Sequence, residues 1–448
     1  MVRRDEQKPV GSNKTHTTMS GFESIIAQNP DQLVEPIDFS LRGPAASYIV
    51  AREECSFFSS QNLVSPNGVK VCRFQLGSSA FLNLGSLYFS MLLTNKSTDK
   101  ALQPLTCEAH CMFSRMIVKC SGTLVENIEL FNVSEEYCRR LLPLEKRLNL
   151  SAQFLGANKA TGANGYDLES KDLPANESKR ILFRPMTSAI LNLRKYWPAL
   201  LLGASGLEIS LELALPSEAF LASGSQAYEL SDLRTICDQV VLTTDLMNSY
   251  TSLMLSGKSI FLNLDLHENT ISFLAGNSSK FAISSARQFS RLNTLVVIMG
   301  QAPGTLAETS QVLNHYLPAS AKESIESHIV ISGLRQPLFS NRGVAEHWVR
   351  FLRGTGIYGG IGTSTSISHE GFGGGSNTPG RAFSLVFDLE RMASHAEHTG
   401  IPIDSGGVTQ IFVEGAGSQP SEYVSSVILQ HQFSGQLEIR DSGCTLYT

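Results

Sequence analysis

Regular alternation of apolar and polar side chains is the feature of this sequence that most constrains its fold. Leucine or isoleucine occupies every second position from Leu207 to Leu215, with glutamate, serine or alanine between. Successive side chains of a β-strand point to opposite faces, so this pattern predicts a strand with one face on a core. Segments 260–267 and 437–440 alternate in the same way. Half-buried strands of this kind are typical of antiparallel sheets.

Further strand-like runs fill much of the remaining chain, and turn residues separate them. Helical spacing of apolar residues occurs in only three segments, whereas an alternating α/β protein of this length would need many more. The sequence therefore predicts an all-β protein with short decorating helices and long loops. The further predicted strands are 47–51, 69–76, 87–94, 116–118, 124–131, 181–184, 230–237, 292–299, 383–387, 408–413 and 424–433.

The three predicted helices lie at 132–143, 246–257 and 344–354, and each stops at a proline or glycine. In the first, Asn132 and Glu135 are spaced like a capping box, in which each side chain bonds the backbone of the other residue. The other two carry apolar stripes at helical spacing, which predict one buried face each.

The length of 448 residues favours two domains, because it is about three times the commonest domain size. Residues 1–40 are polar and without periodicity, so we expect an N-terminal arm there. The strong strand at 207–215 is followed by a turn-rich stretch, which places the predicted boundary near 222. The predicted organisation is an arm at 1–40, a first domain at 41–222 and a second at 223–448.

Composition excludes several classes of protein. A net charge of −5 rules out a chain-wide basic surface, and with it direct nucleic-acid binding driven by counterion release. No run of about 18 apolar residues predicts a membrane span, and no apolar segment follows the charged N-terminus as in a secretory signal. We therefore expect the protein to stay in the cell that makes it. There its eight scattered cysteines are expected as small buried thiols rather than as disulfides.

Two glycine motifs superficially suggest chemistry. Gly354-Thr-Gly356-Ile-Tyr-Gly359 matches the dinucleotide fingerprint, but it follows a predicted helix, whereas that loop must leave a strand and open a helix. Asp404-Ser405-Gly406-Gly407 is similar to the segment around a protease nucleophile, yet no histidine or aspartate partner is marked out. Both are interpreted as turns, and neither a cofactor site nor a catalytic residue is predicted.

Two clusters contain potential metal ligands. These are Cys107-Glu-Ala-His110-Cys111 and His395-Ala-Glu-His398. A structural zinc site needs four ligands, usually as two close pairs, and neither cluster has a companion pair of matching spacing. No metal site is predicted, and the protein is expected not to be an enzyme.

Several motifs, in their order along the chain, resemble those of double jelly-roll major capsid proteins. That lineage includes adenovirus hexon, polinton-like viruses, virophages and the large nucleocytoplasmic DNA viruses. The motifs are Ser121-Gly-Thr-Leu-Val-Glu-Asn-Ile-Glu129, Lys195-Tyr-Trp-Pro198, Gly206-Leu-Glu-Ile-Ser-Leu-Glu-Leu213, Tyr228-Glu-Leu-Ser-Asp-Leu233 with the helix after it, 383–392 with His398-Thr-Gly400, and 428–433 followed by 437–444.

The resemblance implies two tandem eight-stranded antiparallel jelly-roll barrels and a structural role. Family members form pseudo-hexagonal homotrimeric capsomers that tile an icosahedral shell around a DNA genome. The implied location is the virion, and the implied partners are neighbouring capsomers, minor capsid and penton proteins and an internal membrane. The loops 151–179, 303–327 and 354–380 are expected as outward towers and trimer contacts, because loops of such length need partners to be ordered. The arm is expected beneath the capsomer.

A lectin-like β-sandwich that binds host glycans is the alternative. Lectins stack sugars on exposed aromatic rings, and both tryptophans, Trp197 and Trp348, lie in patterns that predict burial. A β-fold hydrolase is a third alternative, and it lacks a recognisable site.

Overall fold

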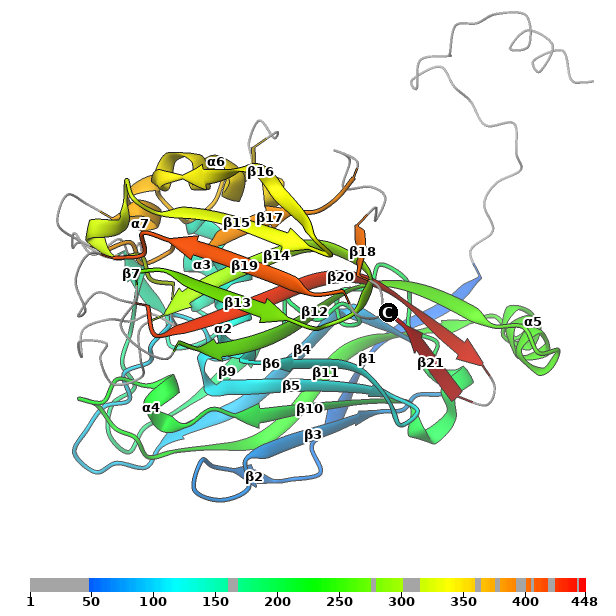
Figure 1. The fold of residues 1–448 in the computed structure, drawn as a ribbon. Coiled ribbons are helices and arrows are strands. Elements are labelled where there is room, and N and C mark those ends of the chain that lie inside the picture. Colours follow the sequence, from blue (N-terminus) through cyan, green and yellow to red (C-terminus); the bar gives the residue numbers. More distant parts are fainter. Residues whose placement is uncertain are drawn as a thin grey trace, which may run out of the picture. The chain divides into compact units, whose positions relative to one another are not determined.

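The computed structural model describes residues 48–159, 168–274, 279–300, 315–358, 364–374, 379–391, 400–403, 407–417, 424–440 and 443–448 (Figure 1). The chain divides into two units, 1–47 and 48–448. The predicted arm at 1–40 lies outside the described residues. Within them, no helix is both long enough and apolar enough to cross a bilayer.

The first half of the described chain forms two antiparallel sheets around one core. One sheet has the order β1 (Ile49–Phe58), β11 (Tyr228–Leu242), β4 (Phe81–Asn95) and β9 (Ser178–Phe183), with β2 (Leu63–Val64) beside β11. The other has the order β3 (Val71–Leu76), β10 (Leu207–Leu213), β5 (Phe113–Cys120) and β6 (Thr123–Glu129). Ring contacts of Phe74 with Phe89, and of Phe113 with Phe183, join the two sheets.

The second half repeats this arrangement strand for strand. One sheet has the order β12 (Ile260–Phe273), β20 (Ser426–Arg440), β14 (Phe289–Gly300) and β17 (Leu385–Asp388), with β18 (Ile401–Ile403) beside β14 and β21 (Gly443–Tyr447) beside β20. The other has the order β13 (Phe281–Ser285), β19 (Thr409–Glu414), β15 (Glu326–Ile331) and β16 (Leu334–Arg342).

The two halves are therefore jelly rolls of identical topology. If the eight main strands of each half are numbered along the chain, both halves have sheets of order 1-8-3-6 and 2-7-4-5. Interleaving of early and late strands in two facing sheets defines a jelly roll. The predicted all-β double jelly roll is confirmed. A small hairpin of β7 (Ala157–Lys159) and β8 (Leu168–Ser170) lies outside the barrels.

The predicted domain boundary near 222 was wrong. β11 pairs with β1 and β4, so it is the last strand of the first barrel and not the first strand of the second. The connection between the barrels is α5 (Thr244–Leu255), which precedes β12. Local alternation cannot reveal this, because the sheet that a strand joins is decided by partners far away in the sequence.

The strand with the strongest alternation exists from Leu207 to Leu213, whereas Leu215, predicted as part of its buried face, lies beyond it and is 49% exposed. The apolar residues of β10 are at most 3% exposed, and the strand pairs with β3 on one side and β5 on the other. Apolar burial contributes about 25 cal/mol per Å² removed from water, so such inward faces are the main source of barrel stability.

All three predicted helices exist, with different degrees of burial. They are α2 (Phe131–Arg140), α5 and α6 (Gly343–Gly354), and the last buries Val344 and Phe351 as expected. In α5 only Met254 is buried, so the predicted buried stripe is wrong there. The other helical segments of the described residues are α3 (Leu144–Ser151), α4 (Pro216–Ala219), α7 (His369–Gly373) and the 3-10 turns η2 (Ala109–Met112), η3 (Ala199–Ser205) and η4 (Ala319–Ala321).

Candidate functional site

A buried ionic network surrounds helix α2, where the two barrels meet. The helix carries Glu135, Glu136, Arg139 and Arg140 within two turns, and all four are at most 4% exposed. Glu108, beside η2, and Arg147 of α3 complete a set of three carboxylates and three guanidinium groups. Since charges lose hydration on burial, such groups are retained only where they pair and hydrogen-bond with one another.

Glu136 is the centre of this network. Its Oε1 accepts hydrogen bonds from Arg140 Nε at 2.7 Å and from Arg147 at 3.1 Å, and its Oε2 lies 3.0 Å from His110 Nε2. Burial by itself would raise the pKa of Glu136. The positive charges of Arg147 and Arg140, with the bond to His110, outweigh burial and hold that pKa well below its ordinary value. Glu136 is therefore ionised in the folded protein.

Glu135 binds a neighbouring segment instead of capping its own helix. Its carboxylate accepts bonds from the backbone N–H groups of Met186 and Thr187 at 2.8–3.0 Å, and from Thr187 Oγ1 at 2.9 Å. It also pairs with Arg139, which contacts Glu108 in turn. The capping-box prediction was wrong, because tertiary donors outcompete the local one. The residue at the cap is Leu130, with a φ of 49°.

The same helix, together with α3, binds residues of the second barrel. Arg140 donates to the carbonyl of Arg381 at 2.7 Å, and the carbonyl of Arg140 accepts from Thr365 Oγ1 at 2.7 Å. Arg147 donates to Ser366 Oγ at 3.0 Å. The ring of Tyr137 stacks on buried His315, 6.1 Å between centroids. Helix α2 and its charges therefore fasten one barrel to the other.

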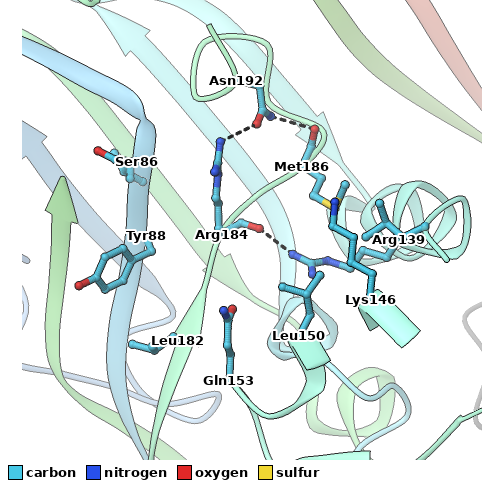
Figure 2. Close-up of a pocket in the computed structure, with 12 residues that line it drawn as sticks. Ser86, Tyr88, Arg139, Lys146, Leu150, Gln153, Leu182, Arg184, Met186 and Asn192 are labelled. Atoms are coloured by element: carbon cyan, nitrogen blue, oxygen red, sulfur yellow. Dashed lines mark hydrogen bonds between the residues drawn. The ribbon is translucent and has the colours of Figure 1, made fainter. Parts of the chain in front are cut away.

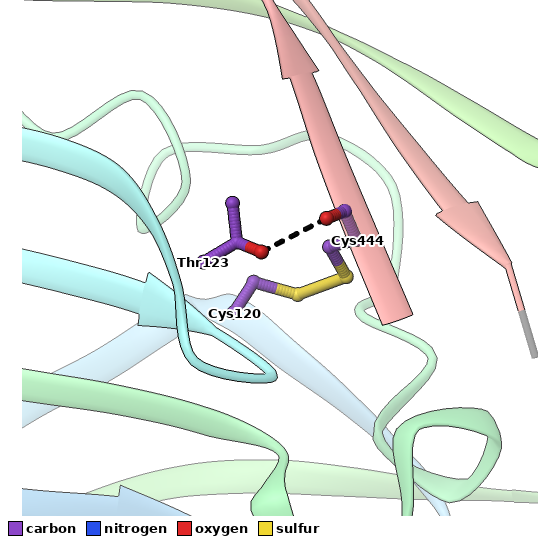
Figure 3. Close-up of a disulfide and its surroundings, with 3 residues drawn as sticks. All are labelled: Cys120, Thr123 and Cys444. Atoms are coloured by element: carbon purple, nitrogen blue, oxygen red, sulfur yellow. Dashed lines mark hydrogen bonds between the residues drawn. A yellow bond between two sulfur atoms is a disulfide. The ribbon is translucent and has the colours of Figure 1, made fainter. Parts of the chain in front are cut away.

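A disulfide forms a second connection between the two barrels (Figure 3). Cys120, at the end of β5, is bonded to Cys444 in β21, 324 residues further along the chain. Beside it, Thr123 Oγ1 donates to the carbonyl of Cys444 at 2.9 Å. The expectation that the cysteines are free thiols was wrong for this pair, because folding brings together two residues that no local spacing connects. The six others are free, and Cys72, Cys107, Cys111 and Cys237 among them are buried.

A cavity of about 520 Å³ lies beside the ionic network, between α2, α3, β4 and β9. Figure 2 shows Asn192 bonded to Arg184 and to the carbonyl of Met186, while Arg139 donates to the carbonyl of Arg184. Its described lining residues include the cations Lys146 and Arg184 and no histidine, cysteine or carboxylate. This lining suits an anionic group and offers no pair for acid–base chemistry.

The structure describes only part of each glycine motif. Gly354 ends α6, and a Cβ there would lie 2.4 Å from Val386 Cγ1, so close helix–strand packing accounts for this glycine. The motif follows α6, as the sequence predicts; Gly359 lies outside the described residues. So do Asp404, Ser405 and Gly406, while Gly407 leads towards β19.

The potential metal ligands that the structure describes do not gather around a common point. Glu108 and His110 serve the ionic network, and both Cys107 and Cys111 are buried thiols whose pKa burial raises to about 12. In the described part of the chain no three His, Cys, Asp or Glu side chains form a group that could hold a metal ion. His395 and His398 lie outside it.

Sequence reasoning missed the ionic network. Its signal was present, since Glu135/Arg139 and Glu136/Arg140 are i,i+4 pairs of opposite charge. Such pairs are common on solvated helix faces, where they contribute only tenths of a kcal/mol. Burial distinguishes the two cases, and it depends on the tertiary structure.

Comparisons with known proteins identify the fold. No family model matches the sequence, and no curated protein does. Among solved structures, a chain of the PBCV-1 virus capsid covers 91% of this chain and 98% of its own length, with a TM-score of 0.58 and 10% identity. A Sputnik virophage chain covers 93% of each, with a TM-score of 0.57 and 10% identity. The Faustovirus major capsid protein covers 90% and 93%, with a TM-score of 0.57 and 7% identity. The chain shares the double jelly-roll fold of these capsid proteins.

Proposed function

We propose that this protein is a viral major capsid protein, which acts by shape and self-association without transforming a substrate. The observation that carries the proposal is the repetition of one jelly-roll topology in both halves of a chain that aligns over about nine-tenths of its length with viral capsid chains. Three such chains would present six similar barrels, the pseudo-hexagonal unit needed to tile a shell. Closed symmetric oligomers are the usual form of such units.

The junction suits this role because a tile must keep its two barrels in a fixed relation. The disulfide Cys120–Cys444 and the α2 network connect the barrels at separate places. Removing either would leave a more flexible unit whose edges no longer match those of its neighbours. In this proposal the partners are other copies, minor capsid and penton proteins and an internal membrane, all enclosing a DNA genome within the virion.

Strand β16 is our candidate for a contact between copies. It is an edge strand, and its apolar residues Leu338 and Phe339 are 73% and 82% exposed. Exposed apolar edges invite pairing with another chain. The predicted contact loops 151–179, 303–327 and 354–380 remain part of the proposal, although parts of each lie outside the described residues.

Native mass spectrometry of the purified full-length chain tests the proposal. A capsomer is expected at about 146 kDa, three times the chain mass of 48.8 kDa. Replacing Leu338 and Phe339 by serine should weaken the trimer, while Leu255→Ser, at an exposed leucine of α5, serves as the matched control. Deleting 356–376 should also impair trimer formation. A strictly monomeric protein that binds glycans on an array would overturn the capsid assignment in favour of a lectin.

A further inference from the structure

Two free cysteines lie opposite each other on adjacent strands of the first barrel's larger sheet. Cys55 of β1 and Cys237 of β11 are directly opposite in the antiparallel register, and their Sγ atoms lie 3.7 Å apart. Residues opposite each other in antiparallel strands have Cα atoms about 4.5–5.5 Å apart, which falls within the span of disulfides. To form a bond of about 2.0 Å, the two sulfurs must approach by about 1.7 Å.

We propose that Cys55 and Cys237 form a second disulfide site, which closes when the folded protein meets an oxidising disulfide such as oxidised glutathione. The bond would fasten β1, an edge strand, to the strand beside it. β1 is the first described strand after residues 1–47, and most of its residues are exposed. The proposal concerns the folded chain alone and does not depend on the capsid assignment.

The environments of the two thiols set the order of reaction. Cys55 is half-buried and Cys237 is 1% exposed, so the reagent reaches Cys55 first. The hydrogen bond between the thiols lowers the pKa of Cys55, which burial and the carboxylates of Asp238 and Glu54 partly oppose. The more accessible thiol is thus also the one favoured as a thiolate, the attacking form in thiol exchange.

The exchange balances with one oxidised glutathione. The Cys55 thiolate attacks one glutathione sulfur, which breaks the glutathione S–S bond and releases one glutathione as thiolate. Cys237 then loses its proton, and its sulfur attacks the Cys55 sulfur of the mixed disulfide, releasing the second glutathione. The cysteine pair loses two electrons and two protons, and one oxidised glutathione becomes two reduced molecules.

Thiol trapping on the full-length wild-type protein tests the site. The native protein is incubated with excess oxidised glutathione, blocked with N-ethylmaleimide, digested without reductant and mapped by mass spectrometry. A peptide linking Cys55 to Cys237 is expected beside the one linking Cys120 to Cys444. Recovery of Cys55 and Cys237 as blocked thiols, or of Cys55 only as a glutathione adduct, would overturn the proposal.

A matched pair of variants supplies the control. Cys55→Ser should abolish the link, whereas Cys72→Ala should retain it, because burial raises the pKa of Cys72 to about 12 and keeps that thiol unreactive. Oxidation should raise the melting temperature of Cys72→Ala more than that of Cys55→Ser. Equal shifts of the melting temperature in the two variants would contradict the idea that the bond stabilises the attachment of β1. If either variant folds poorly, the disulfide peptide map of the wild-type protein decides the question.

Discussion

Individual buried carboxylates are expected to determine how the protein responds to mutation and pH. Glu136 and Glu126 are both buried, at 3% exposed each, yet their surroundings differ. Glu136 is paired with two guanidinium groups. Glu126 has only neutral donors, namely Ser188 Oγ and the N–H groups of Ala189 and Ile190. The same side chain therefore has opposite pKa shifts at the two positions.

Replacing Glu136 by glutamine should destabilise the fold strongly. Arg140 and Arg147 would lose their carboxylate partner while remaining buried, and breaking a buried ion pair from one side costs about 3–5 kcal/mol. The free energy of unfolding from urea titration measures this loss. The control is Glu145→Gln in the exposed pair with Lys159, which should change it by less than about 1 kcal/mol. Similar small losses in both variants would contradict a stabilising network.

Glu126 should make stability fall as pH rises. Burial raises its folded pKa to about 7, above the ordinary 4.5, so the unfolded chain deprotonates first. The contribution of Glu126 to the free energy of unfolding is fully present below pH 4.5 and is lost as pH rises to 7. This loss is on the order of 3 kcal/mol. Glu126→Gln, which cannot ionise, should lack this component. Urea unfolding of both proteins at pH 4.5 to 8 measures the difference, and parallel profiles would refute the assignment.

At the scale of elements, β21 matters because it carries Cys444 to the first barrel. It pairs only with β20 among the described strands, so the disulfide is its covalent link to β5. Cys444→Ser should lower the free energy of unfolding by about 2–5 kcal/mol, the usual loss for a native disulfide. Adding reductant should destabilise the wild type by a similar amount and leave the variant nearly unchanged. If reductant destabilised the variant as much as the wild type, the destabilisation would arise from another pair of cysteines.

At the scale of the whole molecule, residues 48–448 form one compact unit although they contain two barrels. Two fastenings, one covalent and one ionic, connect the barrels, so we expect one cooperative unfolding transition. Combining Cys444→Ser with Glu136→Gln should separate calorimetric unfolding into two transitions. Each single variant should still unfold in one transition, broader than that of the wild type. Two resolved transitions in the wild type would show that the junction does not couple the barrels.

The sequence by itself determined the predominance of strands and the small share of helices. These follow from local periodicity, since a half-buried strand must alternate wherever it lies. Only the tertiary structure decided the boundary after β11, the Cys120–Cys444 bond and the burial of the α2 charges. Each of these depends on partners more than a hundred residues apart or on which helix face meets the second barrel. Local spacing does not indicate which distant residues pair. It does not indicate burial either, because an i,i+4 ion pair has the same spacing on a solvated helix face as in a core.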